Sequence, residues 1–297
     1  MVKNADLDAE SVAESTPDNA ADAPGAEPVS AAADPPDEPN TAIGPDQAEG
    51  LRSMFGDARA RFLCLACALD GDTAVQMTMG MAHSLRQQQR VLYVDDIPLQ
   101  ERQKIQQLAY TARYDIAQAM ENDIPLEKAI QKADDNLWFS VALRMERSFK
   151  HRRLKPPSLM DRLQKLPLEL DVVLLATTQP MKGVLRALSD SLNPIVITAP
   201  DDASLLRAME LLREFSQESH GQPIPIIVVG GQTDTDGQST FEKLSGASQS
   251  LLDQPLNFLG WLAATPVSNA TEKSRQPPGL IIPSTLYAKL AAMALHA

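Results

Sequence analysis

The stretch Arg61-Phe-Leu-Cys-Leu-Ala-Cys-Ala-Leu-Asp-Gly-Asp-Thr73 decides the fold, because an apolar run meets a tight turn and then a helical pattern. The run 61–68 predicts a buried strand, and Thr73 to Gln88 has the apolar period of a helix. A second apolar run, Arg90-Val-Leu-Tyr-Val-Asp-Asp96, follows that helix directly. A strand, a helix and a second strand in this order predict a parallel βαβ unit.

Apolar runs alternate with helical periods along the rest of the chain. Residues 172–175 and 226–229 are continuous apolar runs, as expected of strands covered on both faces. The sequence therefore predicts an α/β fold with a doubly wound, mostly parallel sheet and helices on both faces. The expected strands are 61–68, 90–94, 137–141, 171–176, 194–198, 225–229 and 256–262. The expected helices are 73–88, 101–112, 115–120, 126–133, 158–165, 182–189, 201–218, 238–251 and 284–295.

Residues 1–45 differ from the rest of the chain in composition. They contain ten acidic residues, seven prolines and a single base, Lys3. With few large apolar side chains they cannot offset the entropy lost on ordering, so we expect a disordered acidic tail. Its net charge of −9 leaves −3 of the chain's −12 for residues 46–297. The remainder has no basic stripe, which argues against a nucleic-acid partner.

A short amphipathic helix is predicted at residues 46–58, ahead of a domain spanning 60–297. Asp46 is a natural N-cap, and Glu49 follows three residues later as in a capping box. Ala48, Leu51 and Phe55 share one helix face.

Two cysteines, Cys64 and Cys67, form a C-x-x-C pair inside the first apolar run. In a strand, positions i and i+3 point to opposite faces, and no second pair completes a zinc site. We therefore interpret them as two core thiols, and we expect no metal site and no catalytic residue.

The first turn, residues 68–74, is the place where a phosphate site would lie in this class of fold. A working phosphate-binding loop needs several glycines, a lysine for the terminal phosphates and a hydroxyl for magnesium. Here the turn offers one glycine, Gly71, no lysine, and the carboxylates of Asp70 and Asp72, with Thr73 next. Carboxylates repel a triphosphate, so the turn predicts a degenerate nucleotide site and no cofactor.

The order of these elements resembles the start of the MinD/ParA ATPases, a family of P-loop NTPases. Their turn reads Lys-Gly-Gly-Val-Gly-Lys-Thr, and their second strand ends in Val-Asp-x-Asp. An ungapped alignment implies that the signature lysine is replaced by Ala68, the P-loop lysine by Thr73 and the magnesium-binding threonine by Ala74. The same alignment retains the first aspartate as Asp95 and replaces the second by Ile97.

Later segments resemble the same family. Asp171-Val-Val-Leu-Leu-Ala176 is similar to its Walker B strand, with the first aspartate retained as Asp171 and the metal-side one replaced by Ala176. Residues 197–204 resemble a Val-Thr-x-Pro-Glu segment, and residues 259–262 a Leu-Gly-x-Ile-Pro strand. The resemblance therefore implies a MinD-like fold whose nucleotide site has lost its key residues.

The helix ahead of the domain resembles the N-terminal signature of FlhG, also called YlxH or FleN, a MinD-like regulator of flagellar number. Its fixed positions are Asp46, Gln47, Ala48, Leu51 and Arg52. The resemblance implies that this helix, with Phe55 as a further anchor, binds the FlhF-type signal-recognition GTPase and stimulates it. Flagellar basal-body proteins and transcription regulators are further candidate partners.

Two alternatives stay open at the level of sequence. The first is a working MinD/ParA-like ATPase with a non-standard loop, which alone would require ATP and magnesium. The second is a MinD relative that positions another cellular apparatus.

The last helix, 284–295, either docks on the domain or contacts a membrane weakly, since few basic residues accompany its apolar face. We expect a cytoplasmic protein that reaches the inner membrane or a cell pole through a partner.

Overall fold

The computed structural model describes residues 60–103, 112–145, 159–163, 165–180, 194–217, 219, 221–263 and 283–293. All of them belong to one compact unit, Arg52–Ala297. The expected acidic tail, the expected helix 46–58 and the expected helix 182–189 lie outside the described residues.

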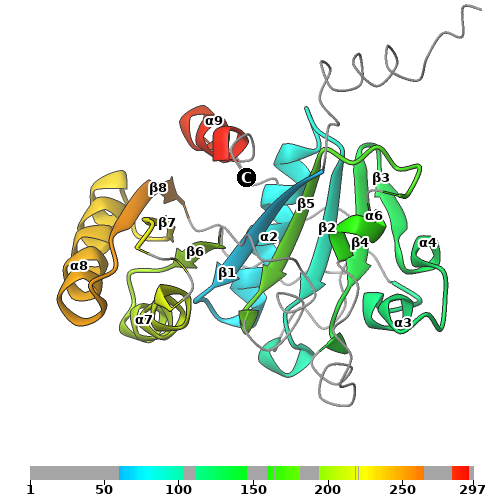
Figure 1. Ribbon diagram of the computed structural model, residues 1–297. Coiled ribbons are helices and arrows are strands. Elements are labelled where there is room, and N and C mark those ends of the chain that lie inside the picture. The colour runs from blue at the N-terminus through cyan, green and yellow to red at the C-terminus, as the bar shows by residue number, and fades with distance from the viewer. Residues whose placement is uncertain are drawn as a thin grey trace, which may run out of the picture. The chain divides into compact units, whose positions relative to one another are not determined.

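The described strands form one mostly parallel sheet in the order β3-β4-β2-β5-β1-β6-β7-β8 (Figure 1). All neighbouring pairs are parallel except β3 and β4, which are antiparallel. The predicted fold class is therefore confirmed. The strands are β1 (Arg61–Cys67), β2 (Val91–Asp96), β3 (Gln131–Asp134), β4 (Leu137–Val141), β5 (Val172–Thr177), β6 (Pro194–Thr198), β7 (Ile224–Val229) and β8 (Leu256–Leu262).

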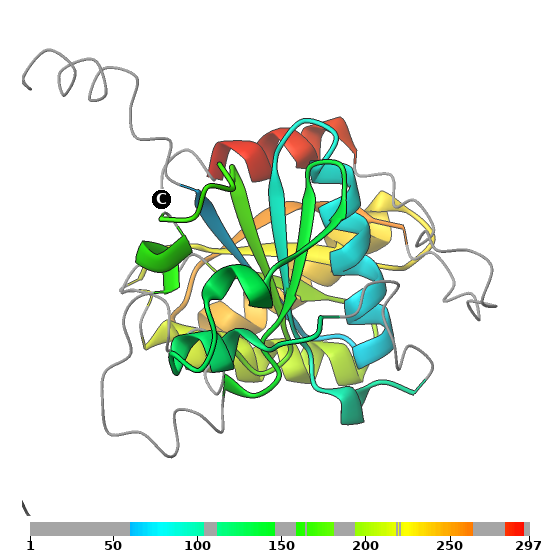
Figure 2. The ribbon, with the colours of Figure 1, turned by 90° about the vertical axis from the view of Figure 1, so that its right-hand side faces the viewer.

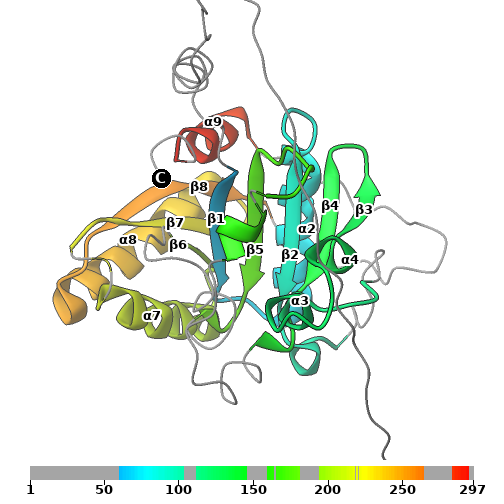
Figure 3. The same ribbon diagram turned by 45° about the vertical axis from the view of Figure 1, so that its right-hand side comes forward.

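Helices cover both faces of this sheet (Figure 3). One apolar layer packs α2 (Gly71–Leu85) and α9 (Ser284–Met293) against the strands. The opposite layer contains α3 (Ile116–Met120), α4 (Leu126–Ala129), α6 (Leu159–Leu163), α7 (Asp202–Ser216) and α8 (Asp234–Leu252). Cys64 belongs to one layer and Cys67 to the other, both buried and free, so the prediction of two core thiols is confirmed.

The expected helix 126–133 was wrong in its second half. Helix α4 ends at Ala129, and residues 131–134 form β3, which pairs with β4. The reason is the turn at residues 135–136, where Asn136 adopts the left-handed conformation with φ 56°. Asparagine tolerates this conformation well, and it closes a hairpin here. The short edge strand carries Lys132, which discourages pairing with another chain.

Other helix boundaries also differ from the expectation, and three cases have a structural reason or consequence. Helix α2 begins at Gly71 instead of residue 73. Helix α8 begins at Asp234 instead of residue 238, because Thr233 and Asp236 form a capping box. The expected helix 101–112 does not begin as predicted, since Arg102 is extended after the 3-10 turn η1 (Leu99–Glu101); residues 104–111 lie outside the described residues.

Helix α9 docks on the domain through its apolar face. Leu286 and Leu290 are buried, and the Lys289 ammonium donates to the carbonyl oxygen of Leu259 at 2.8 Å. Side chains that fill the protein core cannot insert into a bilayer at the same time. Within the described residues, no helix combines the length and the apolar character needed to cross a membrane.

Candidate functional site

The turn between β1 and α2 lies at the carboxyl ends of the parallel strands, where α/β folds place their ligands. It is short: residues 68–70 connect the end of β1 to Gly71, the first residue of α2. The carboxylate of Asp70 caps the helix and accepts a hydrogen bond from the Thr73 amide at 3.1 Å. A helix amino terminus is an anion site because its first amides lack partners. In this chain the protein's own carboxylate takes that position.

A neighbouring segment, residues 99–103, packs against the same helix end; we call it the η1 strap (Figure 2). A Cβ atom added to Gly71 would lie 2.4 Å from the carbonyl oxygen of Glu101, so only glycine fits beneath the strap. The Asp72 carboxylate accepts a hydrogen bond from the Gln103 amide at 3.1 Å. Asp72 is therefore engaged in holding the strap.

The strap is also attached to β2 by an ion pair. The Arg102 guanidinium donates to both carboxylate oxygens of Asp95 at 2.7 Å, and both side chains are almost fully buried. Burial raises the pKa of Asp95, and the guanidinium of Arg102 together with the Ile97 amide opposes that rise. With a cation already bonded to both oxygens, Asp95 is not available to bind a metal or a water molecule.

Arg102 is the residue that sequence reasoning missed, because it fell inside an expected helix. The signal in the sequence that could have pointed to Arg102 was Asp95. A carboxylate that follows a buried strand requires a counter-charge, and the nearest base after it in the sequence is Arg102.

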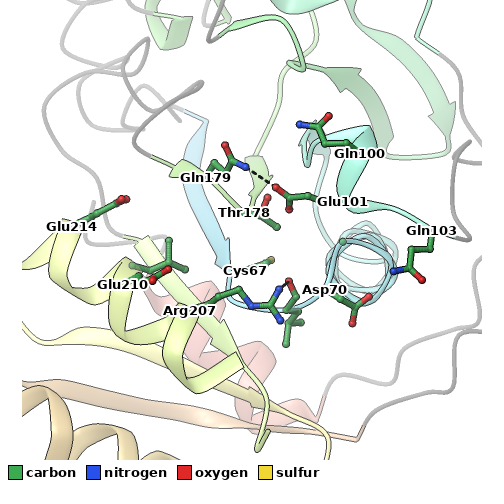
Figure 4. A pocket seen from close by; sticks show the side chains of 13 residues that line it. Cys67, Asp70, Gln100, Glu101, Gln103, Thr178, Gln179, Arg207, Glu210 and Glu214 are labelled. Carbon is green, nitrogen blue, oxygen red and sulfur yellow. Dashed lines mark hydrogen bonds between the residues drawn. The ribbon is translucent and has the colours of Figure 1, made fainter. Parts of the chain in front are cut away.

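A cavity of about 520 Å³ opens beside this turn (Figure 4). Its walls come from the β1–α2 turn, the η1 strap, the residues after β5, and α7. Gln179 donates to the Glu101 carboxylate at 2.6 Å across one side. On another side Arg207 of α7 donates to the carbonyl oxygen of Leu69 at 3.1 Å. The charged side chains of the described lining are Asp70, Glu101, Glu210, Glu214 and Arg207.

The structure brings most of the predicted nucleotide-site residues to one end of the sheet. Asp70, Gly71, Asp72 and Thr73 share the first turn of α2, and the strap links them to Asp95. The buried Ala176 pairs with Asp95 in the sheet register, and its methyl group offers no ligand to a metal. In the part of the chain that is described, no three His, Cys, Asp or Glu side chains cluster as metal ligands.

Asp171 is not part of this group. It precedes β5, next to the amino ends of β1 and β2, and therefore lies at the opposite end of the strands from the turn. Its carboxylate accepts hydrogen bonds from the Arg90 amide at 2.7 Å and from the Arg90 guanidinium at 3.0 Å. The Arg90 hydrogen bonds lower the pKa of Asp171. The predicted partner-binding residues of helix 46–58 lie outside the described residues.

Solved structures with the same fold include MinD proteins, a ParA family ATPase and a putative plasmid partition protein. The MinD cell division protein of Aquifex aeolicus superimposes with a TM-score of 0.51 at 14% identity, over 78% of this chain and 98% of that one. A ParA family ATPase of Chlorobium tepidum gives 0.50 at 17%, over 80% and 99%. The septum site-determining protein MinD of Pyrococcus horikoshii, complexed with Mg-ADP, gives 0.50 at 17%, over 80% and 100%.

No model of a known protein family matches the sequence. No curated protein matches it either. The chain therefore has the fold of the MinD and ParA ATPases, and at these identities the likeness concerns the fold alone.

Proposed function

We propose that this chain is a FlhG-like regulator of flagellar number, placement or assembly that works without an ATPase cycle. In this proposal it binds the FlhF GTPase through the helix 46–58 and stimulates GTP hydrolysis. The observation that supports the lack of an ATPase cycle is the occupied helix end, where Asp70 caps α2 and the η1 strap covers Gly71.

The charges at the turn support a pseudo-ATPase. A phosphate at this position would face Asp70 and Asp72 with no lysine in the turn, and it would have to displace the Asp70 carboxylate from the Thr73 amide. P-loop enzymes gain their transition-state stabilisation from a lysine, a magnesium ion and free amides at this place. This turn has no lysine, and Asp70 already binds the Thr73 amide, so several kcal/mol of that stabilisation are lost and catalysis of ATP hydrolysis is not expected.

The partner assignment is supported by the sequence of the helix ahead of the domain. Its Asp-Gln-Ala-x-x-Leu-Arg pattern retains each fixed position of the FlhG signature, from Asp46 to Arg52. An amphipathic helix docks into a groove through its apolar face. Leu51 and Phe55 supply this face, while Gln47 and Arg52 are the polar groups that would order the GTPase site.

The test is a GTP hydrolysis assay with purified FlhF and the full chain. Gln47→Ala and Arg52→Ala are each expected to abolish stimulation, since each removes a contact to the GTPase site. Arg59→Ala, which changes a nearby arginine outside the signature, is the matched control and should stimulate like the unaltered chain. Stimulation by both signature variants at the unaltered level would refute the proposal, provided thermal melts show folded protein.

An ATPase with an unusual loop remains the second candidate. The observation in its favour is the cavity of about 520 Å³ at the carboxyl ends of the strands, and one similar structure carries Mg-ADP. Micromolar binding of ATP with magnesium would favour this candidate over the pseudo-ATPase.

A further inference from the structure

The strand β8 lies at one end of the sheet and, among the described strands, pairs with β7 alone (Figure 1). The backbone groups of an edge strand can pair with another chain, so folded proteins protect such edges with charges, prolines, bulges or short strands. The opposite edge strand, β3, has four residues and carries Lys132. In contrast, β8 has seven residues and no charged side chain of its own.

The pairing with β7 shows which backbone groups of β8 face its outer edge. Ile224 lies opposite Leu256 and donates its amide to the carbonyl oxygen of Pro255 at 3.0 Å. Alternate residues of a strand direct their backbone groups to opposite sides. Asn257 therefore faces β7, whereas Leu256 and Phe258 direct their N–H and C=O groups outward. A β-bulge follows and ends this regular stretch.

A charge from another element reaches this edge. The Lys289 ammonium of α9 donates to the carbonyl oxygens of Phe258 at 3.3 Å and of Leu259 at 2.8 Å. Leu286 and Leu290, both buried, hold the helix in this place. The ammonium therefore occupies the position from which an added strand would donate its own N–H groups.

We propose that Lys289 guards the outer edge of β8, and that this edge is a latent pairing surface for β8 of a second copy of the chain. The strand suits pairing with itself, because like charges directly opposite destabilise an antiparallel pair and β8 contributes none. The proposal concerns a surface separate from the helix 46–58 and does not depend on the GTPase partner.

The outward groups define the register of this pair. A two-fold axis at Asn257 brings Leu256 of each copy opposite Phe258 of the other. The Phe258 carbonyl then accepts from the Leu256 amide of the second copy, in place of the Lys289 ammonium. Phe258 already packs against Phe241, with ring centroids 5.0 Å apart, so the strand is extended and held without a partner.

The guard acts through its charge. In the unaltered chain Lys289 is exposed to solvent, and its ammonium is bonded to protein carbonyl oxygens and hydrated at the same time. A second strand would displace the ammonium from the carbonyl of Phe258 and bury it beside apolar side chains. Burying a charge without a counter-charge is costly, so the paired state is disfavoured while Lys289 is in place.

The experiment is sedimentation equilibrium of the full chain over a range of protein concentrations. Lys289→Met keeps the apolar part of the side chain, and it should associate at a concentration at least about tenfold lower than the unaltered chain. Lys289→Arg keeps the charge and should behave like the unaltered chain. The matched control Lys243→Met removes an exposed lysine of α8 and should stay within about twofold of it.

A cysteine crosslink locates the interface. Asn257→Cys combined with Lys289→Met should give a disulfide-linked dimer on mild oxidation, because opposite residues at a non-hydrogen-bonded position have Cα atoms about 4.5 Å apart, within disulfide range. Ser239→Cys in the same background, exposed on α8, should give none. The two natural cysteines are buried and do not compete.

Three outcomes would overturn the proposal. The first is a folded Lys289→Met variant, as judged by thermal melts, that associates no more than the unaltered chain. The second is association of that variant without the crosslink at position 257, which would place the contact elsewhere. The third is equal crosslinking of Asn257→Cys with Lys289 present, which would show that the edge is not guarded.

Discussion

The guanidinium of Arg102 lies 2.7 Å from both carboxylate oxygens of Asp95, and each side chain is only 1% exposed. Arg102 therefore supplies the positive charge that the buried carboxylate of Asp95, at the end of β2, requires. Arg102→Met is therefore expected to destabilise the domain by about 3–5 kcal/mol, because it leaves an uncompensated buried charge. Urea denaturation measures this loss.

The compensating change distinguishes charge from packing at this pair. Asp95→Leu combined with Arg102→Met removes both charges together, so most of the stability should return. If the double variant is as unstable as Arg102→Met alone, packing of the η1 strap and not charge neutralisation is its main contribution.

Helix α9 provides the second prediction. Leu286→Ala and Leu290→Ala are each expected to reduce the free energy of unfolding by about 2–5 kcal/mol, as for other large-to-small changes in a core. Thr285→Ala, at an exposed position of the same helix, should have little effect. Equal stability of the leucine variants and this control would show that α9 does not dock in solution.

The two cysteines provide the third prediction. Burial raises the pKa of both Cys64 and Cys67 above its ordinary value, so the reactive thiolate is scarce at pH 8. Native protein should react negligibly with a thiol reagent such as dithiobisnitrobenzoate, and two thiols per chain should react in urea. Rapid reaction of the native protein would contradict the burial of these residues.

Asp171 provides the fourth prediction, which concerns pH. Hydrogen bonds from Arg90 lower the pKa of this carboxyl in the folded state. The stability it contributes is therefore present above the unfolded pKa of about 4 and is lost as the pH falls through the lower folded value. Because both side chains are about one-third exposed, the contribution is limited to about 0.5–1 kcal/mol.

The measurement compares Asp171→Asn with the unaltered chain by urea denaturation at pH 7 and pH 3. The difference in the free energy of unfolding between the two proteins should narrow at pH 3, because this is below the unfolded pKa of about 4 and protonation then favours the unfolded state of the unaltered chain. Asp123→Asn, at an exposed position, serves as the control and should show no such change. A gap that stays constant or widens at pH 3 would contradict the role of the Arg90 hydrogen bonds.

The sheet could be predicted from sequence because its central strands are long apolar runs, such as residues 172–175 and 226–229, which fit only a doubly covered sheet. The edge strand β3 could not. Its Gln131 and Lys132 carry no apolar alternation, and it forms because Asn136 closes a hairpin onto β4. A local sequence pattern predicts secondary structure poorly where pairing with another strand decides it.

The candidate site was predictable in residue types but not in arrangement. The missing lysine and the two carboxylates of the turn are visible in the sequence, and Asp70 has the spacing of an N-cap for α2. The η1 strap was not predictable, because it depends on contacts between residues far apart in the chain, such as Gln103 with Asp72. Asp171 was grouped with the site by resemblance, and only the strand direction shows that it lies at the other end.

The most direct test of the central claim is calorimetric titration of the full chain with ATP and magnesium. The occupied helix end predicts no detectable binding up to millimolar nucleotide. The variant Thr73→Lys, which restores a lysine to the turn, should also fail to bind, because Asp70, Asp72 and the η1 strap still occupy the phosphate position. Micromolar binding of ATP and magnesium by the unaltered chain would contradict the account.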